Sequence, residues 1–199
     1  MHTLKEKETL RSLIIGAARE LFVEEGYRNV SMRKIARKIG YSATTIYLYF
    51  KNKGELVNCL AEEMLEKLVK VFQDVQGENL DPVARLKKMG EAYVRLATED
   101  PNGYRVAFMM ETDLWSKPED YLKEGSQGLR FYQMILNAVE ACVKCREPRR
   151  EEVEAAAQAV FAAVHGLVAL WLTYPAFPWA SRQQLQQVVI DSAVGGIVA

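Results

Sequence analysis

The most informative part of the chain, residues 26–56, reads GYRNVSMRKIARKIGYSATTIYLYFKNKGEL. Ser31 precedes a short apolar pattern of helical spacing that ends at Gly40, and Ser42 precedes a second pattern over residues 43–50. Serine is a favoured N-cap and glycine commonly follows a helix C-terminus, so the stretch predicts two short helices joined by a tight turn. Because the segment is also basic, this is the layout of a helix-turn-helix.

Apolar residues recur at three- and four-residue steps almost everywhere else, and no alternating strand pattern appears. The fold class is therefore expected to be all-α. The run Asp100-Pro101-Asn102-Gly103 is predicted as a turn. The other predicted helices, in chain order, cover residues 10–22, 52–68, 82–98, 104–110, 119–145 with an interruption near Gly125 to Gly128, 148–174 and 181–198.

The composition is that of a soluble globular protein, because 49% of the 199 residues are hydrophobic and 26% are charged. The chain opens with charged residues where a secretory signal would need an apolar stretch, so a cytoplasmic location is expected. Three cysteines suit a reducing compartment, and a core of this size needs no disulfide framework.

The net charge of zero hides an asymmetry along the chain. Residues 1–55 hold eleven basic and six acidic side chains, a net charge of +5, while residues 56–199 hold fifteen basic and twenty acidic ones, a net charge of −5. Such a split indicates that the N-terminal part meets a polyanion.

The helix-turn-helix region also resembles a known family. The resemblance rests on Gly26-Tyr27, Ser31-Met32-Arg33-Lys34-Ile35-Ala36, Gly40-Tyr41-Ser42, Ile46-Tyr47-Leu48-Tyr49-Phe50-Lys51-Asn52-Lys53 and Glu55-Leu56. These runs closely resemble the TetR family of repressors. Further along, Val164-His165-Gly166 is similar to the Trp-His-Gly signature of one branch, with valine in place of tryptophan.

The resemblance implies a three-helix DNA-binding domain over residues 8–68, with the motif at 31–50, and a helical effector-binding and dimerisation domain over residues 69–199. It further implies a homodimer that leaves a pseudo-palindromic double-stranded DNA operator when a small molecule binds. The alternative is a DNA-binding protein of the same fold without an effector.

The second helix of the motif should present one face to DNA. At 100° per residue, Ala43, Ile46 and Phe50 point inward, while Thr44, Thr45 and Leu48 point outward. Threonine hydroxyls can meet base edges in the major groove, and Leu48 or a threonine methyl can contact thymine methyls. Chance exposure of Leu48 is the alternative interpretation.

No basic residue occurs from Ser42 to Phe50, so a bidentate arginine–guanine contact is not expected from this helix. Basic residues beside it suit phosphates, although a solvated helix face explains Arg37 and Lys38 equally well. The resemblance implies a phosphate bond for Tyr47, and for Tyr49 packing is an equal alternative. The predicted DNA-binding residues are Ser31, Arg33, Lys34, Ser42, Thr44, Thr45, Tyr47, Leu48, Tyr49, Lys51 and Lys53.

Aromatic and methionine residues of the C-terminal part predict a cavity for a lipophilic effector rather than a sugar or nucleotide. For any single member, core packing is the alternative. Arg105, Glu111, Arg130 and His165 are unranked candidates for polar anchors. The predicted pocket residues are Tyr93, Tyr104, Phe108, Met109, Trp115, Phe131, Met134, His165 and Trp171.

Small residues on the last two predicted helices suggest a dimer interface, because they let helix backbones approach closely. On the long helix they recur at steps of four and three. Packing of this stripe inside its own subunit is the alternative. The predicted interface residues are Ala155, Ala159, Ala162, Gly166, Ala169, Val188, Ser192 and Gly195.

Other functional classes find little support in the sequence. No phosphate loop, nucleophile elbow or acid–base pair predicts an enzyme, and no cofactor is expected. The pair Cys142 and Cys145 is a lone CxxC, and His2 and His165 are not at metal spacing, so no metal site is expected. Gln158 and His165 interrupt the apolar run 155–172, which favours a bundle helix over a membrane span.

Overall fold

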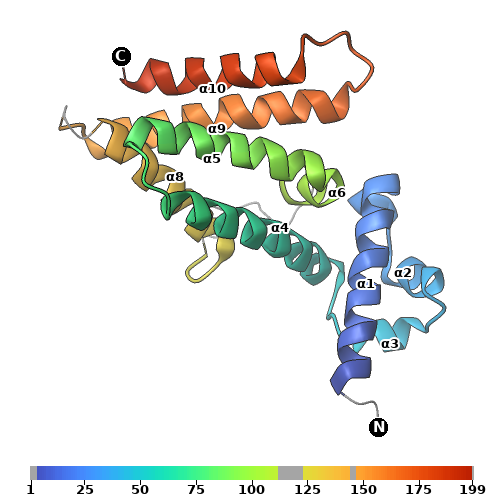
Figure 1. Ribbon diagram of the computed structural model, residues 1–199. Coiled ribbons are helices and arrows are strands. Elements are labelled where there is room, and N and C mark those ends of the chain that lie inside the picture. The colour runs from blue at the N-terminus through green and yellow to red at the C-terminus, as the bar shows by residue number, and fades with distance from the viewer. Residues whose placement is uncertain (1–3, 112–122, 144–146, 199) are drawn as a thin grey trace. The chain divides into compact units, whose positions relative to one another are not determined.

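A computed structural model of the chain describes residues 4–111, 123–143 and 147–198 (Figure 1). Within these ranges every regular element is helical, which confirms the all-α prediction. The elements are α1 (Leu4–Glu25), η1 (Tyr27–Asn29), α2 (Met32–Lys38), α3 (Ala43–Tyr47), α4 (Lys53–Gln76), α5 (Pro82–Glu99), α6 (Pro101–Tyr104), η2 (Arg105–Met109), α8 (Gln127–Val143), α9 (Arg150–Thr173) and α10 (Arg182–Val198).

The chain divides into two compact units. The N-terminal unit comprises Met1–Leu65 and Asn102–Leu122, and the C-terminal unit comprises Glu66–Pro101 and Lys123–Ala199. Helix α4 therefore contributes its first half to one unit and its second half to the other. Every residue after 68 was predicted from the sequence to lie in the second domain. In the structure, the segment that begins at Asn102 instead groups with the N-terminal unit.

The glycines and the capping serine predicted from the sequence mark the ends of helices in the N-terminal unit. Helix α1 ends before Gly26, whose φ of 77° is accessible to glycine at little cost, and Gly40, with φ of 73°, makes the turn after α2. The side chain of Ser31 caps α2 by accepting a hydrogen bond from the Lys34 N–H at 3.2 Å. These features place α2 and α3 in the predicted helix-turn-helix order.

A single apolar core holds this unit together. Ile14 and Phe22 of α1, Ile35 of α2 and Ile46 of α3 are almost completely buried in it. Val106 of η2 is also fully buried in the same core, and Met110 packs against it. The segment after Asn102 therefore supplies apolar side chains that the N-terminal sequence lacks.

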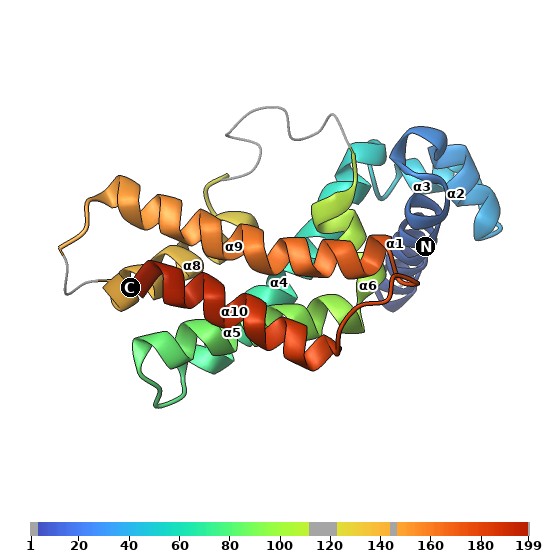
Figure 2. The same ribbon diagram turned by 90° about the horizontal axis from the view of Figure 1, so that it is seen from above.

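The C-terminal unit is a helical bundle formed by α5, α8, α9, α10 and the second half of α4. Helices α9 and α10 form a hairpin and run side by side (Figure 2). Helix α5 approaches α10 closely at Gly90, where a Cβ atom would lie 3.4 Å from the Ile190 side chain. An ion pair between Lys87 and Asp191, at 2.6 Å, joins the same two helices.

Two predicted elements differ from the structure. The turn predicted at residues 100–103 is wrong, because Pro101 begins α6; proline is well accommodated in the first turn of a helix, where its missing N–H has no intrahelical partner. Helix α3 ends at Tyr47 instead of Phe50, since the N–H groups of Leu48 and Tyr49 donate to carbonyls three residues back. That tighter last turn is typical of helix C-termini.

Smaller shifts affect the later helices. Gly128 lies inside α8, and the interruption falls before Gln127, with Gly125 at φ of 79°. Helix α9 begins at Arg150 rather than at Pro148. Residues 119–122 and 144–145 of the predicted helix lie outside the described residues.

Candidate nucleic-acid interface and ligand site

Helix α3 is held by its N-cap. The Ser42 Oγ accepts a hydrogen bond from the Thr45 N–H at 3.1 Å and lies 2.8 Å from the Thr45 Oγ1. Both hydroxyl groups are therefore engaged in the cap. Ser42 and Thr45 were predicted to bind DNA, and in the structure their hydroxyl groups bond to each other at the N-terminus of α3.

The inward and outward faces of α3 follow the predicted pattern. Ile46 is fully buried and Phe50 nearly so, whereas Thr44 is exposed. The side chains of Tyr47 and Leu48 are 53% and 80% exposed, which leaves both available to a partner. Tyr49 is half-buried and packs against the core of the unit, as the packing alternative proposed.

The four predicted phosphate-binding cations fall into two pairs. Arg33 and Lys51 have exposed side chains that find no partner among the residues the structure describes. Lys34 instead forms an ion pair with Glu25 of α1. The Lys53 Nζ donates to the Tyr27 carbonyl and lies 3.9 Å from the centre of the Tyr27 ring, and burial lowers its pKa.

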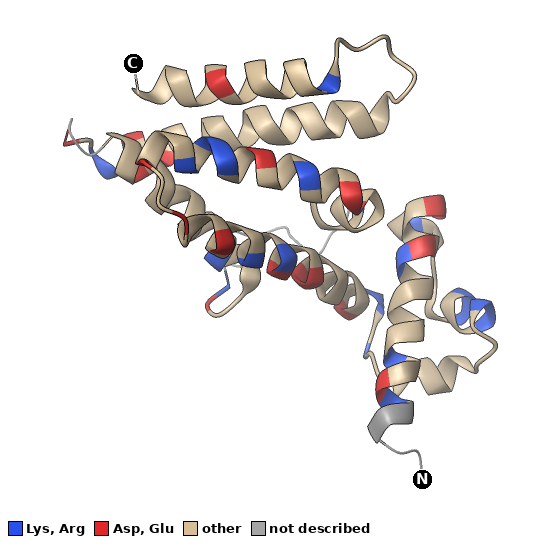
Figure 3. Cartoon of the chain, viewed as in Figure 1, with Lys and Arg blue, Asp and Glu red and all other residues tan. Residues whose placement is uncertain are grey.

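Acidic residues of the same unit also engage two neighbouring cations. Lys38 lies 2.9 Å from Glu20, and this hydrogen bond raises the pKa of Lys38. The exposed side chains of Arg28 and Glu111 pair at 3.2 Å. In Figure 3 basic positions, in blue, lie along α2, and both basic and acidic positions, in blue and red, lie along α1. Fewer positive charges are therefore available to a polyanion than the number of lysine and arginine residues in this part of the sequence suggests.

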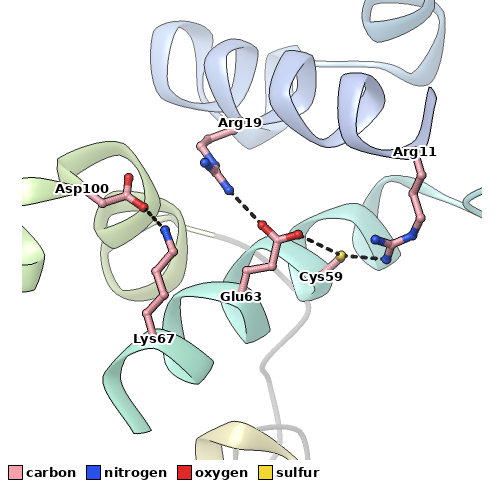
Figure 4. A network of polar contacts seen from close by, with 6 residues as sticks. All are labelled: Arg11, Arg19, Cys59, Glu63, Lys67 and Asp100. Atoms are coloured by element: carbon pink, nitrogen blue, oxygen red, sulfur yellow. Dashed lines mark hydrogen bonds and ion pairs between the residues drawn. The ribbon is translucent and has the colours of Figure 1, made fainter. Parts of the chain in front are cut away.

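A polar network joins α1 to α4 and fixes the helix that follows the motif (Figure 4). Arg19 donates to Glu63 at 2.8 Å, and Arg11 lies 3.1 Å from the Cys59 Sγ. Cys59 itself lies 3.9 Å from Glu63, and burial raises the pKa of its thiol. None of these contacts was predicted, because they depend on how two helices distant in sequence pack.

The C-terminal unit contains an aromatic cluster drawn from four helices. Phe131 of α8 lies within 6.2 Å of three other rings, measured between ring centroids, namely those of Phe72, Tyr93 and Phe161. Phe161 also lies 5.6 Å from the ring of His165, and both residues are on α9. Apart from the Tyr93 hydroxyl and the His165 ring, the side chains of this cluster are apolar.

One polar pair lies within this cluster. The Tyr93 hydroxyl is 3.3 Å from the His165 Nδ1, and burial lowers the pKa of His165, so the neutral ring is favoured. A neutral histidine and a phenol can each donate or accept a hydrogen bond. The pair can therefore orient one polar group of an otherwise apolar ligand.

The structure brings together only part of the predicted pocket. Tyr93, Phe131 and His165 meet in the cluster, and Met134 of α8 and Trp171 of α9 are also buried. Tyr104, Phe108 and Met109 belong to the N-terminal unit, and Trp115 lies outside the described residues. Sequence reasoning missed Phe72 and Phe161, although Phe161 precedes His165 by one helical turn.

The remaining polar candidates are not members of the cluster. Arg105 and Glu111 group with the N-terminal unit, and the Arg130 side chain is exposed. Cys142 is half-buried, with its pKa raised by burial, while Cys145 lies outside the described residues. The described residues contain no group of three or more His, Cys, Asp and Glu side chains suited to a metal ion.

The small-residue stripe of α9 faces outward in the single subunit. Ala155, Ala159 and Ala162 are exposed, and Gly166 and Ala169 are half-buried. On α10, Val188 is 60% exposed, Ser192 is exposed, and a Cβ at Gly195 would meet nothing within 4 Å. By length and composition α9 could cross a membrane, a test that core helices of soluble proteins also pass.

Models of two protein families match the chain. One, described as bacterial regulatory proteins of the tetR family, covers residues 14–60, and the other, described as a tetracyclin repressor-like C-terminal domain, covers residues 86–192. The chain belongs to the TetR family. The expectation drawn from the helix-turn-helix residues is thus confirmed, and members of this family are transcriptional regulators rather than enzymes.

Relatives of this TetR-family protein include regulators of fatty acid metabolism. A fatty acid metabolism regulator protein of Bacillus subtilis is 25% identical over 171 residues, covering 85% of this chain and 87% of that protein. The regulator FadR from Bacillus subtilis, solved in complex with stearoyl-CoA, has a TM-score of 0.74 at 23% identity, covering 93% and 98% of the two chains. A probable transcriptional regulator of Pseudomonas putida, ArpR, is 28% identical over 180 residues, covering 87% and 85%.

Proposed function

We propose that this regulator is a cytoplasmic repressor that binds a pseudo-palindromic operator as a homodimer and releases it when a long acyl chain binds to the C-terminal unit. The observation that carries the ligand class is the aromatic cluster around Phe131. Its rings form an apolar region in the interior of the C-terminal unit, and the Tyr93–His165 pair supplies one hydrogen-bonding point.

The chemistry of this cluster suits an acyl chain. Ligand sites are mostly apolar with a few well-placed polar groups, which matches three phenylalanine rings around a single tyrosine–histidine pair. A sugar or a nucleotide would need many more hydrogen-bond partners. The fatty acid metabolism regulator and the stearoyl-CoA complex among the relatives support the same ligand class.

The proposed homodimer rests on the α9–α10 hairpin. Beyond the charged first turn of α9, residues 155–198 contain two charged side chains, Arg182 and Asp191, and this part of the hairpin is almost entirely tan in Figure 3. All the large hydrophobic residues classed as exposed in the described part of the C-terminal unit lie on it, namely Leu170, Tyr174, Phe177 and Val188. An apolar surface of this kind marks a protein–protein interface. A second copy would supply the two half-sites with one recognition helix each.

The test is a thermal-shift and operator-release experiment with stearoyl-CoA. Ligand at one hundred times its Kd stabilises a folded protein by about 2.7 kcal/mol, so the unfolding temperature should rise and a fluorescent operator should dissociate. Acetyl-CoA, which has the same head group without the long chain, is the control and should do neither. Phe161→Ala should reduce the response while the helical circular dichroism is retained.

The opposite result would separate the two hypotheses for this fold. A protein that binds its operator but shows neither a thermal shift nor release with acyl-CoA of any chain length would contradict the proposed ligand. If a wider set of lipophilic compounds also failed, the protein would be a DNA-binding member of the fold without an effector.

A further inference from the structure

The segment that contains α3, which is expected to contact the DNA bases, has an unusual chemical composition. Residues 41–50 include no arginine, lysine, asparagine, glutamine, aspartate, glutamate or histidine. The side chains that most often distinguish bases are arginine on guanine and asparagine or glutamine on adenine, each through two hydrogen bonds. Neither kind of contact can come from this helix.

Two of the four hydroxyl groups on residues 42–47 already bond within the protein. Ser42 and Thr45 bond to each other at 2.8 Å, and Ser42 also accepts the Thr45 N–H. The methyl group of Thr45 remains, as do the Thr44 side chain and the Tyr47 hydroxyl. Apolar groups therefore make up much of the surface that α3 can offer.

Leu48 dominates that surface. Its side chain is 80% exposed, the largest exposed fraction among the large hydrophobic residues of the described chain. It directly follows α3, and it contributes almost nothing to the core. In the major groove the apolar feature of a base pair is the C5 methyl group of thymine.

We propose that the protein recognises its operator by apolar contact between Leu48 and a thymine methyl group in each half-site, without a guanine contact from α3. The inference rests on the proposed operator binding and specifies how the base is distinguished. The operator should therefore have thymine at the position that faces Leu48.

The test begins with selection of bound duplexes from a random pool. Each thymine of the selected operator is then replaced by uracil, which removes the methyl group and keeps every hydrogen-bonding edge. At one position per half-site, wild-type affinity should fall about fourfold, the value expected for one buried methyl group, and about fifteenfold when both half-sites are changed. Leu48→Ala should bind the thymine and uracil operators equally at that position.

Leu13 provides a matched control, because it is another leucine of the N-terminal unit and is 49% exposed. Leu13→Ala should keep the full wild-type sensitivity to uracil. Unfolding temperatures should be similar for the wild type and both variants, since neither leucine is buried.

Two results would overturn the inference. One is a wild-type affinity that does not change when uracil replaces thymine at any position. The other is a Leu48→Ala variant that loses as much affinity as the wild type when thymine is replaced by uracil. Loss of affinity with 7-deazaguanine operators, combined with indifference to uracil, would show that guanine is read from outside α3. If no duplex is selected at all, the proposed operator binding fails first, so the two failures are distinguishable.

Discussion

The carboxylate of Glu63 on α4 accepts a hydrogen bond from the Arg19 guanidinium on α1 at 2.8 Å. Both side chains are only partly exposed, and their residues are 44 positions apart in sequence. The pair therefore fixes the long helix that follows the motif against the first helix of the same unit.

Glu63→Gln should lower the free energy of unfolding by about 1 kcal/mol, because it leaves the half-buried guanidinium without its charged partner. Urea unfolding followed by circular dichroism measures the change. Glu66→Gln, which alters an exposed glutamate of the same helix, is the control. Equal unfolding midpoints for the two variants would show that the pair contributes nothing.

The cations near α3 should differ in their effect on DNA binding. Arg33→Gln and Lys51→Gln should each reduce the slope of log affinity against log salt by about 1 per subunit, because each removes a free phosphate-binding charge. Lys34→Gln should change the slope less, since Glu25 already neutralises Lys34.

Titrations of a selected operator between low and moderate salt would measure these slopes. Lys70→Gln, which removes an exposed charge from the C-terminal unit, should leave the slope unchanged. Equal effects of all four substitutions would instead indicate that the salt dependence reflects the overall charge of the protein rather than contacts with particular phosphates.

His165 should make stability depend on pH. Burial lowers its pKa in the folded state below the usual 6.5, so the unfolded chain binds a proton more readily as the pH falls below that value. The free energy of unfolding should therefore decrease as the pH falls from 7.5 to 5.5. His165→Gln should reduce this decrease, as measured by urea unfolding at the two pH values.

His2 is the other histidine of the sequence, so His2→Gln is the natural control for that measurement. It should show the same pH dependence as the wild type. An unchanged pH dependence in His165→Gln would contradict the assignment of the effect to the aromatic cluster.

Ala162→Leu should weaken self-association, because a larger side chain on the exposed stripe overpacks the proposed interface at a cost of about 1–3 kcal/mol. Sedimentation should show more monomer, and operator binding should weaken with it. Ala157→Leu offers a contrast, since Ala157 is buried within the subunit and its enlargement should lower the unfolding temperature directly. An Ala162→Leu protein that sediments as an intact dimer but melts early would place the stripe inside one subunit.

Features set by neighbouring residues could be predicted from the sequence. The caps at Ser31, Ser42 and Asp81 and the positive φ values of Gly26 and Gly40 are local, so a few adjacent residues determine them. The same is true of the buried face of α3. These signals were sufficient to order the helices of the motif.

Features that depend on distant residues could not be predicted in this way. Nothing near Lys34 or Lys53 in sequence shows that one pairs with Glu25 and the other with the Tyr27 carbonyl. Phe72 was likewise not predicted to join Phe131, because the two residues are on different helices. Such pairings become visible only when the helices are packed.

The position of Val106 in the core of the N-terminal unit has a consequence for synthesis of the chain. Residues 66–101 separate the two pieces of that unit, and a ribosome needs about 2 to 7 seconds to add them at 5 to 20 residues per second. During this interval α1, α2 and α3 have no Val106 to fill their core. The N-terminal unit therefore completes its core only after the first 36 residues of the C-terminal unit have been made, and a nascent chain interrupted before residue 106 carries α3 on an incompletely packed support.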